Sequence, residues 1–63
     1  MSLTQRQRDV AELIAAGTST ATVAAVLGLS VRTVSGHLRV IYPRLGITSR
    51  HQLAEALTRL DAA

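Results

Sequence analysis

The chain has 63 residues and a formal net charge of +3, and its length allows only one domain. Because it has no cysteine, a disulfide framework and a thiolate metal site are excluded. Apolar residues make up 48% of the chain, mostly alanine, leucine and valine, and one tyrosine is the only aromatic residue. This composition argues against disorder and favours packed helices over a sheet. Because no apolar run could cross a membrane and the first residues are polar, we expect a cytoplasmic protein that does not contact a membrane.

The charged residues are unevenly distributed. The acidic residues lie near the two ends, at Asp9, Glu12, Glu55 and Asp61. The stretch between them has no acid and contains Arg32, Arg39, Arg44 and Arg50. A central basic stretch is typical of a surface that binds a polyanion. On charge alone, a solvated face without a partner is the alternative.

The first two of four predicted helices are bounded by capping residues and glycines. Thr4 and Gln7 form a capping box ahead of apolar residues at helical spacing, and Gly17 ends that segment. The hydroxyl residues 18–20 offer N-caps for a second helix, which runs to about Leu27.

A third helix follows a glycine turn, which gives the helix-turn-helix layout. Gly28 lies in this turn, where a positive φ is commonly required, and Ser30 caps a helix over residues 31–44. Ala24 is small, as is needed where two helices cross closely. The residues at the spacings that would pack the two helices together are Val23, Leu27, Leu29 and Val34.

The third helix is predicted to carry two different faces. Its apolar, core-facing residues are Val34, Leu38, Ile41 and Leu45. The residues on another face, roughly 140° round the helix, are Arg32, Ser35, Gly36 and Arg39. A glycine inside a helix costs about 1 kcal/mol relative to alanine. A helix pressed into a major groove gives a reason to keep Gly36, and a glycine that is merely tolerated is the alternative.

The end of the third helix and the fourth helix are less regular. Pro43 deletes the backbone hydrogen bond to the carbonyl one turn earlier, which predicts either a kink or an early helix end. Residues 45–47 form the next break. Ser49 and Gln52 make a second capping box, which opens a fourth helix through about Leu60.

The chain resembles the LuxR-type helix-turn-helix family, which includes the output domains of NarL- and FixJ-like response regulators. The resemblance runs from Leu3 to about Leu60. The residues that carry it are Leu3-Thr4, Arg6, Val10, Leu13-Ile14-Ala15, Gly17, Ser19, Val23-Ala24, Leu27, Ser30, Thr33-Val34, His37, Ile41, Leu45-Gly46, Ser49-Arg50 and Ala54.

The resemblance implies an all-α domain of four helices over residues 3–61, which binds duplex DNA sequence-specifically to regulate transcription. It places the third helix in the major groove, with Arg32, Ser35, Gly36 and Arg39 as the base-facing candidates. Arg39 would contact a guanine or a phosphate, and the alternative is that it makes no contact with DNA. The residues expected near phosphates are Thr20, Thr22, Thr33, Arg44 and Arg50.

The resemblance also implies that the fourth helix pairs two domains on a two-fold DNA site. The expected dimer seam is Leu53, Ala56, Leu57 and Leu60, although core packing must take part of this stripe. RNA polymerase is a further candidate partner.

Two single positions and one segment depart from the family pattern: Gln7 stands where glutamate is usual, Ser35 where lysine is usual, and residues 20–22 where Asn-Lys-Glu-like residues are usual. Losing a lysine should weaken attraction to the DNA backbone and change base preference, so no family consensus site is assumed. Ser35 also keeps open an alternative function, a helical protein-interaction module without DNA affinity. A sigma-factor-like domain that reads promoters on polymerase is a second alternative.

No pattern predicts an enzyme, a cofactor or a metal site. His37 and His51 are too isolated to form a metal site, and there is no Ser–His–acid set or glycine-rich phosphate loop. We expect His37 to be a partly buried packing residue, and a phosphate contact is the alternative.

Overall fold

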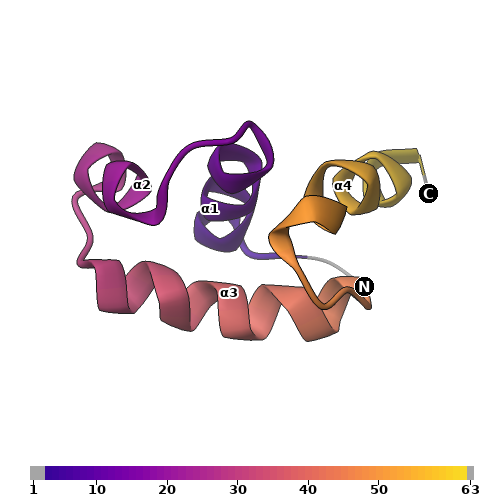
Figure 1. Cartoon of the computed structure of the whole chain (residues 1–63). Coiled ribbons are helices and arrows are strands. Elements are labelled where there is room, and N and C mark those ends of the chain that lie inside the picture. The colour runs from indigo at the N-terminus through magenta and orange to yellow at the C-terminus, as the bar shows by residue number, and fades with distance from the viewer. Residues whose placement is uncertain (1–2, 63) are drawn as a thin grey trace.

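The computed structural model describes residues 3–62, which form only helices, turns and loops. The elements are α1 (Gln5–Ala15), α2 (Thr20–Leu27), α3 (Val31–Leu45), the short 3-10 helix η1 (Arg50–Gln52) and α4 (Leu53–Ala62). Figure 1 shows α3 running along one side of the domain, with α2, α1 and α4 arranged in that order along it. The predicted all-α fold of four helices is confirmed.

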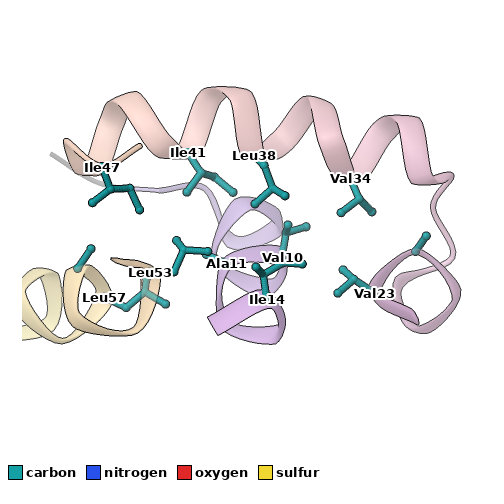
Figure 2. Packing of buried hydrophobic residues seen from close by; sticks show 12 residues of the cluster. Val10, Ala11, Ile14, Val23, Val34, Leu38, Ile41, Ile47, Leu53 and Leu57 are labelled. Atoms are coloured by element: carbon teal, nitrogen blue, oxygen red, sulfur yellow. The ribbon is translucent and has the colours of Figure 1, made fainter. Parts of the chain in front are cut away.

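The core lies between α3 and the three other helices. Figure 2 shows Val34 of α3 facing Val23 of α2, and Leu38 of α3 facing Val10 of α1. Farther along α3, Ile41 faces Leu53 of α4. The buried hydrophobic residues are Val10, Ala11, Ile14, Val23, Ala24, Val34, Leu38, Ile41, Ile47, Leu53, Ala56 and Leu57. Because α3 contributes only one side to this core, its opposite side is left to the solvent.

Side-chain caps begin the first three helices where the sequence predicts them. Thr4 Oγ1 accepts from the backbone N–H of Gln7 at 3.1 Å, and Gln7 Oε1 accepts in return from the N–H of Thr4 at 3.0 Å. The hydroxyls of Ser19 and Ser30 accept from the third residue of their helices at 3.2 and 3.0 Å. Each cap satisfies an amide that the helix itself leaves without a partner.

The turn between α2 and α3 depends on Gly28, whose φ is +69°. The N–H of Leu29 donates to the carbonyl of Ala24 at 2.8 Å, and the N–H of Gly28 donates to the carbonyl of Ala25 at 3.4 Å. This pair of bonds closes a helix with a left-handed residue just after its end. Between α2 and α3 the chain bends by 106°, within the range typical of a helix-turn-helix.

Pro43 does not end α3. The helix continues through it to Leu45, so the alternative of an early end is wrong. Pro43 is exposed, while Ile41, two residues earlier on the opposite side of the helix, is fully buried. The carbonyl that loses its partner can therefore bond to water, and the apolar side of the helix still packs. Gly46, with a φ of +68°, then closes the helix in the same way as Gly28 closes α2.

The fourth predicted segment divides into η1 and α4. Gln52 Oε1 accepts from the N–H groups of Thr48 at 2.8 Å and Ser49 at 3.2 Å, so Gln52 supplies its half of the predicted capping box. A single 3-10 turn follows, and the α-helix begins only at Leu53.

α4 is held against α1 by its apolar side and by an ion pair. Arg8 of α1 donates to both carboxylate oxygens of Asp61 at 2.6 Å and to Glu12 at 3.0 Å. These hydrogen bonds, Asp61 first, raise the pKa of Arg8 above its ordinary value, so Arg8 remains a cation. The contact joins residues near the two ends of the chain and so ties α4 to α1.

The predicted dimer seam needs correction at three positions. Leu53, Ala56 and Leu57 are 0%, 3% and 7% exposed, because α4 uses them to cover α1 and the end of α3. They belong to the core of the monomer and are not available to a second copy. Only Leu60, which is half-buried, retains accessible apolar surface from the predicted set.

Within the described residues no single helix is long and apolar enough to span a membrane. α2 and α3 meet the requirements of length and composition only as a pair, and the chain is sharply bent between them.

Candidate nucleic-acid interface

The outward side of α3 is a continuous polar face, which we call the reading face: Arg32, Ser35, Gly36 and Arg39. All four residues are exposed, whereas Val34, Leu38 and Ile41 on the other side of the same helix are buried. The four residues line an open depression of about 480 Å³. The structure thus brings together the four residues that the sequence analysis placed on one face.

Gly36 is the one residue without a side chain among the four that line this depression. An alanine Cβ built at Gly36 would have no heavy atom of another residue within 4 Å apart from the helix's own neighbouring backbone. Its backbone is helical, and no positive φ requires a glycine there. Neither packing nor backbone geometry inside residues 3–62 therefore explains the missing side chain. The space above Gly36 is open to whatever approaches α3 from outside.

The two arginines beside Gly36 are not neutralised within the domain. Arg32 and Arg39 make no ion pair or hydrogen bond with any residue between 3 and 62. The acidic residues lie on α1 and α4, where Arg8 and Arg59 pair with three of them: Glu12, Glu55 and Asp61. The fourth, Asp9, accepts from Gln5 at 2.8 Å. The reading face therefore presents uncompensated positive charge, as a polyanion-binding surface requires.

A second cluster lies where the start of α2 meets η1. Arg50 Nη2 donates to Thr20 Oγ1 at 3.2 Å, which joins two of the residues predicted near phosphates. Thr22 Oγ1, also on α2, accepts from Ser19 at 3.0 Å. A threonine whose oxygen accepts internally keeps its own hydroxyl hydrogen to donate elsewhere.

The other predicted contact residues lie on α3. Thr33 Oγ1 accepts from Ser30 at 2.9 Å in the first turn, in the same arrangement as Thr22 with Ser19. Arg44 is exposed in the last turn. His37 is half-buried, which fits both the packing role and the phosphate contact considered for it. No group of three histidine, cysteine or acidic residues placed to hold a metal ion occurs between residues 3 and 62.

Two features of this surface escaped the sequence analysis. The Arg50–Thr20 hydrogen bond joins segments far apart in the chain, and no spacing rule predicts it. Val40, on α3 beside the reading face, is 42% exposed. A helical wheel could have predicted this exposure. On it, Val40 lies roughly 40° from Gly36 and 60° from His37, away from the centre of the apolar side.

Comparison with known proteins decides the family. A family model described as bacterial regulatory proteins, luxR family, matches residues 1–57. The chain belongs to the LuxR family. As a member of it, this LuxR-family domain is a helix-turn-helix DNA-binding module of transcription regulation, and the family is one of regulators, not enzymes.

Several regulators contain a similar segment. UhpA of Escherichia coli, a transcriptional regulatory protein, is 40% identical over 55 residues, covering 87% of this chain and 28% of UhpA. Mb0914c of Mycobacterium bovis, by its name a candidate HTH-type transcriptional regulator, is 43% identical over 58 residues, covering 92% of this chain and 7% of that protein. The chain therefore spans only a small part of these relatives. No solved structure matches the chain significantly.

Proposed function

We propose that this LuxR-family domain binds duplex DNA sequence-specifically by laying the reading face of α3 in the major groove. The observation that carries the proposal is the open depression between two uncompensated arginines, above a glycine that nothing inside the domain requires. A major groove accepts an α-helix, and a side chain at Gly36 would hold the helix away from the base edges.

The arginines of the reading face give the proposal its chemistry. An arginine donates two parallel hydrogen bonds to O6 and N7 of guanine, a pattern that no other base pair presents in the same place. Arg39 follows Arg32 by seven positions, which is about 10 Å along a helix, or about three base pairs of DNA. We therefore assign Arg32 and Arg39 to guanines near the two ends of a short recognition sequence, and Ser35 to a base edge between them.

We assign the hydroxyls and arginines around the reading face to the DNA backbone. Phosphate contacts position a protein on the duplex without reading its sequence. The residues with this role are Thr20, Thr22, Thr33, Arg44 and Arg50. They lie at the starts of α2 and α3, in the last turn of α3 and in η1, so they would hold the domain from both sides of the reading face.

We further propose that two domains bind a two-fold site through α4. With Leu53, Ala56 and Leu57 in the core, Leu60 is the apolar residue of the predicted seam that can take part. We expect two domains to bind each duplex, and Leu60→Glu should lower this stoichiometry to one. Sedimentation or native mass spectrometry of the complex can measure it. RNA polymerase remains a candidate partner of the bound regulator.

Selection of bound sites from random duplexes tests the proposed function. The wild-type domain should enrich a short sequence that contains guanine, and Arg39→Ala should relax the choice at one base pair and weaken binding there by about 1–3 kcal/mol. A wild-type domain that enriches no sequence would contradict the proposal. It would favour a protein-interaction module, the function that Ser35 left open.

A further inference from the structure

Val40 is a large apolar side chain on an otherwise polar side of α3. It is 42% exposed, whereas Ile41, the next residue, is completely buried. Val40 lies one turn after Gly36 and about 40° round the helix from it. It therefore stands at the edge of the reading face and does not contribute to the core.

Val40 is not one of the residues that line the depression, but it follows one of them, Gly36, by one turn of α3. Side chains on an α-helix lean toward the N-terminus and cover the turn before their own Cα. For Val40 that turn holds Gly36, and because a Cβ atom at Gly36 would meet nothing within 4 Å, the Val40 side chain does not close the space above it. A molecule that lies along α3 over Gly36 would therefore reach the exposed side chain of Val40 at the edge of the depression.

The major groove contains one apolar group that fits such a contact. Of the four bases, only thymine carries a methyl group there, and apolar side chains recognise it by van der Waals contact and by excluding water. We infer that Val40 contacts the 5-methyl group of a thymine and makes the domain prefer a T·A pair at that position. This inference rests on the proposed binding of α3 in the major groove.

Replacement of thymine by deoxyuridine tests the inference directly, because it removes the methyl group and keeps every hydrogen-bonding group. Each thymine of the selected duplex is replaced in turn, and affinity is measured for the wild type and for Val40→Ala. Loss of one buried methyl group corresponds to about fourfold in affinity. The wild type should show this loss at one thymine in each half-site, and Val40→Ala should bind the two duplexes equally.

Val26→Ala is the matched control. Val26 is 63% exposed on α2, away from the reading face, so this variant should keep the wild-type response to deoxyuridine. Both substitutions replace an exposed helical valine by a better helix former, so the fold should be retained and circular dichroism checks it.

Two results would overturn the inference. One is a selected site in which no thymine responds to removal of its methyl group. The other is a Val40→Ala domain with the same response as the wild type, which would assign the methyl contact to another residue. In both cases the wild type still selects a sequence, so failure of the inference is distinguishable from failure of the proposed function.

Discussion

Arg50 and Thr20 are joined by a 3.2 Å hydrogen bond across 30 positions of sequence, from the guanidinium Nη2 to the hydroxyl oxygen. The bond ties η1 to the first residue of α2. An arginine that is already oriented loses less side-chain freedom when it binds a phosphate than a freely rotating one. We therefore expect Arg50 to be a backbone-positioning residue of the interface.

The first prediction is that Arg50→Ala weakens binding to all duplexes to a similar degree. If Arg50 neutralises one phosphate, the slope of log affinity against log salt should become shallower by about 0.9. Sequence choice should not change, because phosphate contacts carry no base information. Fluorescence anisotropy titrations at several salt concentrations measure both quantities.

Arg59→Ala is the control for this measurement. Arg59 has the same charge but lies on α4, where it donates to Glu55 at 2.8 Å. Its removal should leave the salt slope unchanged. Equal slopes for Arg50→Ala and the wild type would show that Arg50 contacts no phosphate.

The second prediction concerns Gly28 and its φ of +69°. Gly28→Ala should lower the free energy of unfolding by about 1–2 kcal/mol, because an L side chain is disfavoured in the left-handed region. A Cβ there would meet nothing within 4 Å, so the cost is one of backbone conformation and not of packing.

A chemically synthesised domain with D-alanine at position 28 gives the opposite expectation. A D residue prefers positive φ, and it restricts the unfolded chain more than glycine does. The D-alanine domain should be more stable than the wild type by up to about 1 kcal/mol in denaturant titrations. If both alanine isomers had the same effect, steric preference at the turn would not be the cause.

The third prediction is that Pro43→Ala stabilises the domain. Pro43 interrupts the hydrogen bonding of α3, and alanine would restore the missing N–H. We expect the free energy of unfolding to rise by about 1–3 kcal/mol. The full difference in helix propensity between proline and alanine is about 3 kcal/mol. Part of this gain is offset because proline restricts the unfolded chain of the wild type more than alanine does. A fall in stability would mean that the proline ring makes a packing contact that its exposure does not indicate.

Local patterns predicted the helices well, because their ends are determined by neighbours in the sequence. Thr4, Ser19 and Ser30 cap their helices by contacts that reach three residues. Gly28 and Gly46 end theirs through bonds to carbonyls within five residues. The reading face was likewise predictable, because a helical wheel alone separates Arg32 and Arg39 from the buried Val34 and Leu38.

Contacts between distant segments could not be predicted in the same way. The apolar stripe of α4 is compatible with a core or with an interface, and only the position of α1 shows that Leu53, Ala56 and Leu57 are buried. The Arg8–Asp61 pair spans 53 positions, and sequence spacing carries no information about it. For Pro43, the sequence left a kink and an early end open, and packing of Leu45 against the core beyond Pro43 favours continuation of the helix.

The central claim, that α3 reads DNA through the open space above Gly36, is tested most directly by Gly36→Leu. Leucine is a better helix former than glycine by about 0.8 kcal/mol, so the variant should be at least as stable as the wild type. Its side chain should project into the depression and lower affinity for the selected duplex by about fivefold to a hundredfold, which corresponds to the roughly 1–3 kcal/mol expected for a lost base contact. Gly36→Ala, which adds a smaller side chain, should have an affinity for the selected duplex between those of the wild type and of Gly36→Leu.

The decisive measurement is therefore the affinity of Gly36→Leu for the selected duplex, with its unfolding free energy measured beside it. We predict opposite signs: a domain that is equally or more stable and binds its site much more weakly. A folded Gly36→Leu domain that binds the selected duplex as tightly as the wild type would contradict the account, because the outward face of α3 could not then lie against the bases.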